Sequence, residues 1–384
     1  MITKLEKPVL VTKPLAPNKS EVFALLDEVY DSGWFTNIGK QHQLFEKEVA
    51  DFLRVDNLLA FSNGTMALIT ALKTLNLPEG SEVITTAFTF AATTHAISWN
   101  GLKPVFADIN EKTMTLDPEA IEKAITPNTS AILAVHVYGF VCDVEAIEKI
   151  AKKHNLKVIY DAAHAFSTEI NGKPISKWGD ATMLSFHSTK LFNTIEGGGL
   201  IFNNQNLSNK AYELRNFGIK VFDDPEEIKE GIKCKDFIKD VGINGKLNEF
   251  QAAWGRVCLQ EVEAEQNRRK EIANIYKQEL KNIEGILIPE MEVSVKNSMQ
   301  YFPILIAEKR DDIYEKLVEA NIYARKYFYP LCSDFGCYKN LDSATKENLK
   351  VSYATANKAL CLPFYGELKN NEVNFICNII KQNI

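Results

Sequence analysis

The sequence contains no apolar run long enough to cross a membrane. A membrane-spanning helix needs about 18 or more consecutive apolar residues, and no segment of the 384 residues approaches that length. The first ten residues, MITKLEKPVL, have no continuous apolar core and no small-residue cleavage site, so we expect no signal peptide. These absences predict a cytoplasmic protein without a membrane partner.

An excess of basic residues is missing as well. The 44 lysines and arginines are outnumbered by 50 aspartates and glutamates, which gives a net charge of −6. A dedicated nucleic-acid-binding protein normally presents a basic face, so we expect no nucleic-acid partner. This overall balance still allows a local basic pocket for a phosphate group.

Paired cysteine motifs and a dinucleotide fingerprint are also absent. An odd number of scattered cysteines favours reduced thiols, and without short-spaced ligand pairs we expect no structural metal. No G-x-G-x-x-G follows a predicted strand, which argues against a dinucleotide-binding protein. The seven cysteines, none of them in a C-x-x-C pair, are Cys142, Cys234, Cys258, Cys332, Cys337, Cys361 and Cys377.

Short apolar runs alternate with helical patterns between about residues 57 and 205. After the first run, for example, Leu68, Ile69, Leu72 and Leu75 follow helical spacing. This alternation predicts an α/β fold with a mainly parallel central sheet flanked by helices. Ligands of such folds bind outside the carboxyl ends of the strands. The predicted strands cover residues 58–61, 82–88, 103–109, 131–139, 157–163, 181–187 and 198–202.

The rest of the chain follows a different pattern. Residues 247–283 read as one long helix, and strand-like runs follow at 299–307 and 322–330 with a helical segment between them. This mixture predicts a smaller α+β domain. We therefore expect a large cofactor-binding domain over residues 1–250 and a small C-terminal domain over residues 251–384.

Three segments place polar groups at the ends of predicted strands. The first, SNGT at 62–65, lies between a strand and the start of a helix. Free backbone N–H groups and the helix dipole suit a phosphate there, and Gly64 would let the backbone approach it closely. The same residues could equally cap the helix, with Asn63 or Thr65 bonding to its first turn.

The other two segments carry a carboxylate and an amine. Asp161 ends the apolar run KVIY, and a partly buried aspartate needs a cation or a hydrogen-bond donor as its partner. Lys190 lies between a strand that ends near Phe186 and the consecutive glycines 197–199. A crowded lysine can have a lowered pKa and act as a nucleophile. Taken singly, Asp161 could be a cap and Lys190 an ordinary surface residue.

Together, the three segments match the needs of one cofactor. Pyridoxal 5′-phosphate requires a lysine for its Schiff base, an aspartate for its ring nitrogen and a helix N-terminus for its phosphate. The order and spacing of positions 64, 161 and 190 resemble those of the fold-type-I aminotransferases. The motifs FSNGTMAL, VHVYG, YDAAHAFST, SFHSTK with EGGG, and GINGKLNEFQAA resemble the DegT/DnrJ/EryC1/StrS family of nucleotide-sugar aminotransferases.

This resemblance covers nearly the whole chain and implies roles for the matching residues. Lys190 would form the Schiff base and move protons, and Asp161 would pair with the ring nitrogen. Asn244 matches an asparagine that the family sends to the neighbouring subunit's cofactor phosphate, which implies a homodimer with a shared site. The other implied cofactor ligands are Gly64, Thr65 and Ser185 at the phosphate, Phe90 (alternatively Phe88) against the ring, and His164 beside the ring hydroxyl.

The roles of several neighbouring residues stay open. His136 and His187 follow strand residues and could line a pocket, although the pattern favours a buried core histidine at each position. Glu196 matches an acidic residue that precedes the glycines in the family. The basic stretch where the family's second domain approaches the substrate could hold a phosphate or form a solvated face, and it consists of Arg325, Lys326 and Tyr327.

The reaction that the resemblance implies is an amino transfer from L-glutamate to a nucleotide-linked keto sugar, for surface polysaccharide biosynthesis. The strings FNTIEGG and VTKPLAPN resemble the branch that aminates dTDP-4-keto-6-deoxyglucose. Thr86 and Cys332 replace a proline and a histidine that are common on the family's substrate side, so another nucleotide sugar or a small keto-phosphate is an alternative acceptor.

Two readings from other classes stay open. One is a metal-dependent hydrolase that uses Asp161, His164 and His187. The other is a non-catalytic regulatory protein that keeps the same fold.

Overall fold

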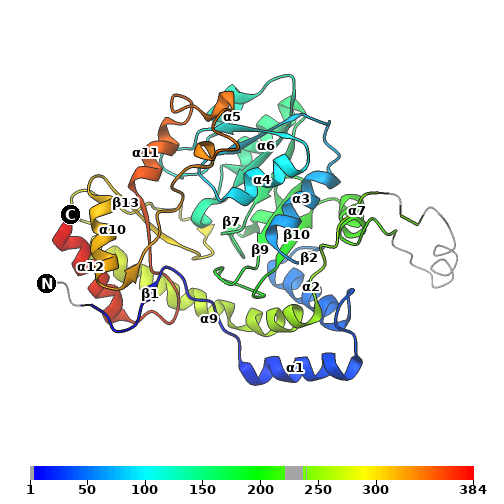
Figure 1. The fold of residues 1–384 in the computed structure, drawn as a ribbon, viewed down its shortest axis with the longest axis horizontal. Helices are drawn as coiled ribbons and strands as arrows, with labels where there is room; N and C mark the ends of the chain where they lie inside the picture. The colour runs from blue at the N-terminus through cyan, green and yellow to red at the C-terminus, as the bar shows by residue number, and fades with distance from the viewer. Residues whose placement is uncertain (1–3, 221–236, 239) are drawn as a thin grey trace.

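A seven-stranded sheet forms the centre of the structure (Figure 1). The computed structural model describes residues 4–220, 237–238 and 240–384. Strand β10 is antiparallel to both of its neighbours, whereas the other neighbouring strands pair in parallel. The mainly parallel sheet expected from the sequence is therefore confirmed. In spatial order its strands are β2 (Leu59–Phe61), β10 (Gly198–Phe202), β9 (Ala181–Ser185), β6 (Lys157–Asp161), β5 (Thr129–Val135), β3 (Glu82–Thr86) and β4 (Lys103–Ala107).

The central strands are buried on both faces, as their nearly continuous apolar sequences predict. Leu133 in β5 and Ile159 in β6 are fully buried, and so is their neighbour Ile132. Strand β5 ends at Val135, earlier than the predicted 131–139, because Tyr138 and Gly139 turn the chain with φ values of 59° and 97°. The sheet strands thus stop at a common edge, where the loops begin.

Several of the helices that connect the strands start at polar caps. Asp117 accepts a hydrogen bond from Glu119 N–H with Pro118 in the first turn, and Asp143 accepts one from Ala146 N–H. The helices of this part of the chain are α1 (Lys19–Ser32), α2 (Lys40–Leu53), α3 (Gly64–Thr74), α4 (Ala91–Trp99), α5 (Pro118–Ala124), α6 (Val144–His154) and α7 (Gln205–Arg215).

Besides the large sheet, the described residues form three small sheets, and one of these, with three strands between residues 286 and 362, lies near both ends of the chain (Figure 1). The predicted long helix is confirmed as α9 (Glu249–Leu280). Strand β1 (Val9–Leu10) pairs in parallel with β14 (Ile322–Tyr323), so an N-terminal segment joins the C-terminal half. The other strands and α-helices beyond α9 are β11 (Ile286–Leu287), β12 (Val295–Lys296), β13 (Phe302–Ile306), α10 (Arg310–Glu319), α11 (Lys350–Lys358), β15 (Ala359–Leu362) and α12 (Asn370–Asn383).

The apolar residues of the C-terminal half form a core of their own. Ile304 and Leu360 of the small sheet, Ile313 of α10 and Ile376 of α12 pack in one buried cluster, and Val9 of β1 joins it.

The predicted boundary at residue 250 stays a prediction. Six cysteines are unpaired thiols, and Cys234 lies outside the described residues. No helix among the described residues is long and apolar enough to span a bilayer.

A buried ion pair ties α2 and α7 to β2, the edge strand of the large sheet. The fully buried Arg215 donates to Glu46 and to Ala60 O, the latter at 2.7 Å, and Glu46 also accepts from Ala60 N–H at 2.6 Å. Burial alone would raise the pKa of Glu46, but the charges of Arg215 and His42 overcome burial and lower this pKa to about 2. Glu46 is thus held as a carboxylate by the buried guanidinium.

Replacing Glu46 by glutamine should destabilise the fold by about 3–5 kcal/mol, because it leaves Arg215 buried without a counter-charge. The matched control is Glu48→Gln, which breaks the more exposed pair with Arg256 and should cost about 1 kcal/mol or less. Urea unfolding at fixed protein concentration measures both. Equal costs would contradict this account of the buried pair.

Candidate active site

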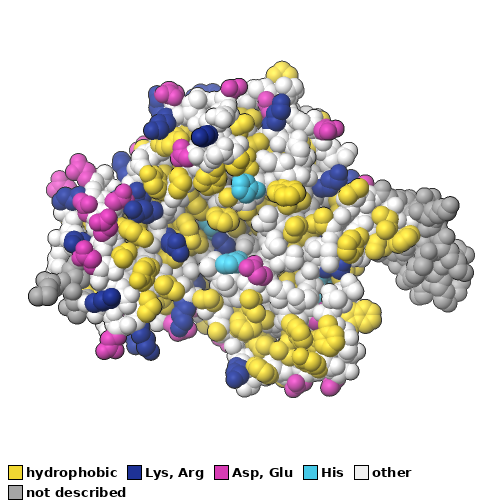
Figure 2. All heavy atoms as spheres, in the orientation of Figure 1, with side chains coloured by type: hydrophobic (Ala, Val, Ile, Leu, Met, Phe, Trp, Pro, Cys, Tyr) yellow, Lys and Arg dark blue, Asp and Glu magenta, His cyan; other side chains and the backbone are white. Residues whose placement is uncertain are grey.

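A cavity of about 320 Å³ lies beyond the carboxyl ends of the large sheet's strands. Figure 2 shows a hollow near the centre of one face, with histidine, acidic and basic side chains around it. Three other hollows among the described residues are larger, at about 410, 430 and 450 Å³, so the chemistry of its lining and not its size marks this cavity. Its wall brings together most of the predicted site residues: Gly64, Thr65, Phe90, Asp161, His164, Ser185 and Lys190.

Asp161 is a buried carboxylate at the end of β6. Only 4% of the residue is exposed, and its oxygens accept hydrogen bonds from Thr93 Oγ1 at 2.7 Å and from Ala163 N–H at 3.0 Å. Burial raises its pKa, while these hydrogen bonds and the charge of Lys190 oppose that rise. No lysine or arginine of the described residues forms a salt bridge with it. Asp161 therefore faces the cavity as a buried carboxyl group whose ionised form a cationic ligand atom would stabilise.

Lys190 lies in the loop after β9 and lines the same cavity as Asp161. Its N–H donates to His187 O at 2.8 Å, and its Nζ lies 5.9 Å from the centre of the Tyr301 ring. Burial lowers the pKa of the amine to about 8, and the charge of Asp161 limits the decrease. Near neutral pH, a larger fraction of this amine is unprotonated than for an ordinary lysine. Lys190 is thus suited to act as a nucleophile.

The start of α3 supplies backbone donors at the cavity. Asn63 is the cap, since its Oδ1 accepts from Met66 N–H at 2.9 Å and its carbonyl accepts from Ala67 N–H at 3.2 Å. The first N–H groups of a helix have no intrahelical partner, so those of Gly64 and Thr65 are available to an anion. The capping and phosphate interpretations are therefore compatible, because different atoms serve each purpose.

Each of the three consecutive glycines is required by a close approach. A Cβ on Gly197 would lie 1.9 Å from Thr194 Oγ1, and one on Gly199 would lie 2.7 Å from Phe186 Cζ. A Cβ on Gly198 would lie 2.6 Å from the backbone of Asn63 and of Gly64. Strand β10 thus presses directly against the loop that begins α3, which only glycine permits.

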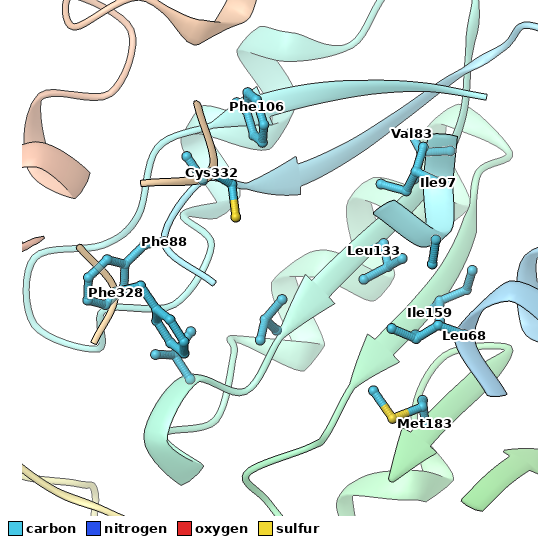
Figure 3. Close-up of a cluster of buried hydrophobic side chains, with 14 of the residues drawn as sticks. Leu68, Val83, Phe88, Ile97, Phe106, Leu133, Ile159, Met183, Phe328 and Cys332 are labelled. Carbon is cyan, nitrogen blue, oxygen red and sulfur yellow. The ribbon is translucent and has the colours of Figure 1, made fainter. Parts of the chain in front are cut away.

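The two candidate aromatic residues separate clearly. Phe88 is fully buried, with its ring 5.9 Å from Tyr138 and 5.8 Å from Phe328 (Figure 3). Phe90 is 64% exposed and lines the cavity. Phe90 is thus the residue whose ring is open to a ligand, and Phe88 belongs to the core.

His164 is held as a neutral ring with a defined donor. Its Nδ1 accepts from Tyr138 N–H at 3.0 Å, and its ring lies parallel to that of Phe328 with centroids 5.9 Å apart. Burial, followed by the charge of Lys190, lowers its pKa well below the usual value. Because Nδ1 accepts, the proton of the neutral ring is on Nε2, which can donate to a ligand.

The histidines with open roles also separate. His136 is buried, stacks on Tyr160 with ring centroids 4.9 Å apart, and does not line the cavity. Burial lowers its pKa to about 3, so it is a neutral core residue. His187 does line the cavity, where its Nε2 lies 3.5 Å from Oε1 of Glu196.

Two predicted residues lie away from the cavity of their own chain. Asn244 and Arg325 are both exposed, and neither of them lines the cavity. Tyr327, from the same basic stretch as Arg325, does line it. Lys326 instead forms a 2.7 Å salt bridge with Asp311. A role for Asn244 at the cofactor therefore requires a second copy of the chain, as the sequence analysis expects.

Sequence reasoning missed several residues that shape the site. Thr93, in the first turn of α4, donates a hydrogen bond to Asp161, and no motif marked it. Tyr301, Tyr327 and Phe328 reach the cavity from the C-terminal half, more than 100 positions from Lys190 in the sequence. The alternation of helices and strands carries no signal for such long-range contacts.

The metal-dependent hydrolase finds no support in the geometry. Within residues 4–220, 237–238 and 240–384, no three histidine, cysteine, aspartate or glutamate side chains are placed to hold a metal ion together. Asp161, His164 and His187 all line the cavity, but they do not converge as ligands.

Replacing Gly198 by alanine should destabilise the fold by about 1–3 kcal/mol, because the added Cβ must displace the backbone that starts α3. Gly336→Ala is the matched control, since its Cβ would meet nothing within 4 Å, and it should leave stability nearly unchanged. Chemical unfolding compares the two variants. A Gly198→Ala protein as stable as the control would show that this approach is not constrained.

Comparison with known proteins identifies the family. The DegT/DnrJ/EryC1/StrS aminotransferase family matches residues 17–381. The chain is 41% identical over 382 residues to dTDP-4-amino-4,6-dideoxy-D-glucose transaminase of Shigella dysenteriae, which covers 98% of this chain and 100% of the relative. It is 40% identical over 377 residues to the Escherichia coli protein of the same name, covering 96% of each.

Solved structures agree with this assignment and with the fold expected from the sequence. DesI, crystallised in the presence of its TDP-sugar product, superimposes with a TM-score of 0.90 at 31% identity, covering 99% of this chain and 94% of DesI. PseC of Helicobacter pylori is described as an aminotransferase involved in the biosynthesis of pseudoaminic acid. It superimposes with a TM-score of 0.88 at 28% identity, covering 98% of this chain and 99% of PseC. The chain therefore belongs to the DegT/DnrJ/EryC1/StrS aminotransferase family and is a transaminase.

Proposed function

We propose that this transaminase holds pyridoxal 5′-phosphate on Lys190 and transfers an amino group from L-glutamate to the keto group of a nucleotide sugar. The observation that carries the proposal is that Asp161, Lys190 and the start of α3 face one cavity. Asp161 is buried without a described cationic partner, Lys190 has an amine of lowered pKa, and Gly64 and Thr65 offer backbone N–H groups. This donor set fits a cofactor with a basic ring nitrogen, an aldehyde and a phosphate.

The acceptor we propose is dTDP-4-keto-6-deoxyglucose. The relatives at 41% and 40% identity are named dTDP-4-amino-4,6-dideoxy-D-glucose transaminases, and DesI is described with a TDP-sugar product. These names support a dTDP-linked sugar and amination at carbon 4. By the same likeness, we propose that the protein acts in the cytoplasm. Its physiological role there would be to supply an amino sugar for the biosynthesis of a surface polysaccharide.

The residues of the chain would divide the work at the cofactor. When bound, the cofactor supplies an electron sink for the charge that develops at the donor's α-carbon. Asp161 would stay ionised against the ring nitrogen, and His164 Nε2 would donate to the ring hydroxyl. Gly64, Thr65 and Ser185 would bind the phosphate, and Phe90 would cover one face of the ring.

Lys190 would act as the proton carrier. Its amine, once free of the covalent bond, would take the proton from the donor's α-carbon and deliver it to the reactive carbon of the cofactor. An amine with a pKa of about 8 can both accept and give a proton near neutral pH. The same residue would then carry the reverse transfer to the keto substrate.

We also propose that the chain works as a homodimer. Exposed aromatic side chains gather where α1 ends and α9 begins, with Tyr30 and Phe35 rings 5.6 Å apart and Phe35 and Phe250 rings 5.9 Å apart. Tyr30 is 65% exposed and the nearby Trp34 is 56% exposed. An exposed apolar group of this kind supports a protein interface, and a second copy could bring Asn244 to the neighbouring cavity.

Purified protein incubated with L-glutamate and dTDP-4-keto-6-deoxyglucose should release 2-oxoglutarate and form the 4-amino sugar nucleotide. The Lys190→Ala variant should keep the fold and release none. A panel with other nucleotide keto sugars and small keto-phosphates, followed by 2-oxoglutarate release, measures the preference. A response to a keto-phosphate alone would overturn the nucleotide-sugar proposal, and full turnover by Lys190→Ala would overturn the role of the lysine.

Replacing Asp161 by asparagine should leave the cofactor bound but slow its reaction with glutamate by about 100-fold or more, because a neutral amide no longer stabilises a protonated ring nitrogen. Thr93→Val is the graded control, since it removes the 2.7 Å hydrogen bond to Asp161 and a 2.9 Å hydrogen bond with Thr89 but keeps the Asp161 carboxyl group, and it should have a smaller effect. Stopped-flow absorbance under single-turnover conditions separates the two. An unchanged rate in Asp161→Asn would make the aspartate merely structural.

A further inference from the structure

Glu196 is an acidic side chain of the cavity that has no part in holding the cofactor. Among the described residues that line the cavity, Asp161 and Glu196 are the acidic ones, and Lys190 is the only lysine or arginine. No lysine or arginine of the described residues forms a salt bridge with Glu196, whose side chain is 55% exposed. Its carboxylate is therefore available to accept hydrogen bonds from a substrate.

The pairing of β9 with β10 places Glu196 opposite His187. These strands are antiparallel, with Ser185 opposite Gly198. Two hydrogen bonds continue this register beyond the strands, from Phe186 N–H to Gly197 O at 2.9 Å and from Ser188 N–H to Ile195 O at 2.7 Å. His187 and Glu196 are the pair between these bonds, where facing side chains lie closest. They share the face of Ser185, which also lines the cavity.

His187 presents a hydrogen-bond donor to Glu196. Its Nδ1 is contacted by the backbone N–H of Thr189 at 3.2 Å and by the hydroxyl of the same residue at 2.8 Å. Because a backbone N–H can only donate, Nδ1 accepts, and the proton of the neutral ring is on Nε2. Nε2 lies 3.5 Å from Oε1 of Glu196. The histidine thus orients one carboxylate oxygen and leaves the other for a ligand.

The backbone around this pair is held in place beside the lysine. Glu196 O accepts hydrogen bonds from Thr194 Oγ1 and from Gln251 Nε2, each at 2.8 Å. On the other side of the hairpin, Lys190 N–H donates to His187 O at 2.8 Å. The pair is therefore positioned in advance, in the same turn that carries Lys190.

The charge of Glu196 decides which part of a substrate can lie beside it. An ionised carboxylate has only acceptor atoms, so it binds hydroxyl groups and repels other anions. L-Glutamate carries an α-carboxylate and a side-chain carboxylate, and the nucleotide carries a diphosphate. The neutral, hydroxyl-bearing ring of the keto sugar is therefore the part that fits this position.

We infer that Glu196 determines specificity for the sugar by accepting a hydrogen bond from the hydroxyl group next to the keto carbon, with His187 as its positioning residue. The inference rests on the proposed function for the presence of a keto sugar in the cavity. That hydroxyl, on carbon 3 of the proposed acceptor, lies nearest because the keto carbon must reach the cofactor on Lys190. Glu196 takes no part in the reaction with L-glutamate.

Glu196→Gln separates the reaction of the sugar from that of the donor. With the accepted keto sugar, kcat/KM should fall about tenfold or more, because a hydrogen bond to a charged group is lost. An analogue without the neighbouring hydroxyl should react poorly with wild type already, and the substitution should add little. Stopped-flow absorbance with L-glutamate should give a rate equal to wild type or higher, because the repulsion is removed.

A binding measurement gives a second readout. Calorimetric titration of the holoprotein with the amino sugar nucleotide should show an affinity about tenfold or more weaker in Glu196→Gln, whereas the affinity for dTDP, which has no hexose, should not change. Glu119→Gln, on the exposed face of α5, is the matched control and should leave both affinities and all rates at the wild-type values.

Two substitutions of His187 test its positioning role. His187→Leu removes the donor, whereas His187→Gln keeps an N–H group that can face Glu196. The leucine variant should raise KM for the keto sugar more than it lowers kcat, and it should leave the reaction with L-glutamate unchanged. The glutamine variant should recover most of the loss. Equal effects of both substitutions would contradict the positioning role.

The outcomes distinguish this inference from the proposed function. If Glu196→Gln keeps the wild-type preference for the sugar over its deoxy analogue, or weakens dTDP as much as the amino sugar nucleotide, the inference is wrong. A slower reaction with L-glutamate would also overturn it. Glu196→Asp, which keeps a shorter carboxylate, should show an intermediate loss and serves if the glutamine variant folds poorly. Wild-type protein that does not react with L-glutamate, or accepts no keto sugar, would instead refute the proposed function and the inference with it.

Discussion

The site depends on the carboxyl group of the buried Asp161 and the amine of the partly buried Lys190, which line one cavity. Asp161 ends β6 and Lys190 follows β9, and these two strands are parallel neighbours in which Asp161 lies opposite Met183. Burial raises the pKa of Asp161 and lowers the pKa of Lys190, so it favours the neutral form of each group. The charge of the other group opposes both changes. The register of two strands thus sets an electrostatic balance that a charged ring can complete.

The antiparallel strand β10 makes this arrangement compact. Its first residue, Gly198, lies opposite Ser185 at the end of β9 and opposite Phe61 at the end of β2. Because Gly198 has no side chain, the loop before α3 lies directly against β10. The backbone donors of Gly64 and Thr65 are thereby held beside the residues that follow β9. Sheet topology, and not loop flexibility, brings the three parts of the site together.

Local sequence signals predicted most of the large sheet and the main chemistry of the cavity. The strands were predictable because their apolar runs are buried on both faces, and α9 because its length exceeds that of any other periodic segment. Lys190, Asp161 and Gly64 stood out because each lies at or after the end of a predicted strand, where ligands bind, and the resemblance to the family joined them into one predicted site. The sequence left Phe88 and Phe90 undecided, because two aromatics in an alternating run have the same local signal until the burial of each is known.

Contacts between distant segments could not be predicted in the same way. The pairing of β1 with β14 joins residues near position 10 with residues near position 322. Tyr301 and Phe328 reach the cavity from beyond α9, and Arg215 finds Glu46 from 169 positions away. Such contacts follow from how the elements pack, and neither periodicity nor a short motif records that packing. Asn244 is a related case, since its proposed ligand belongs to another copy of the chain.

The central claim is that one amine, that of Lys190, carries the cofactor covalently while Asp161 supports it. Reduction of the holoprotein with borohydride, followed by proteolysis and mass spectrometry, tests this most directly. The account predicts a phosphopyridoxyl group on the peptide that contains Lys190, in stoichiometric yield. Label on another lysine, with the Lys190 peptide unmodified, would contradict it.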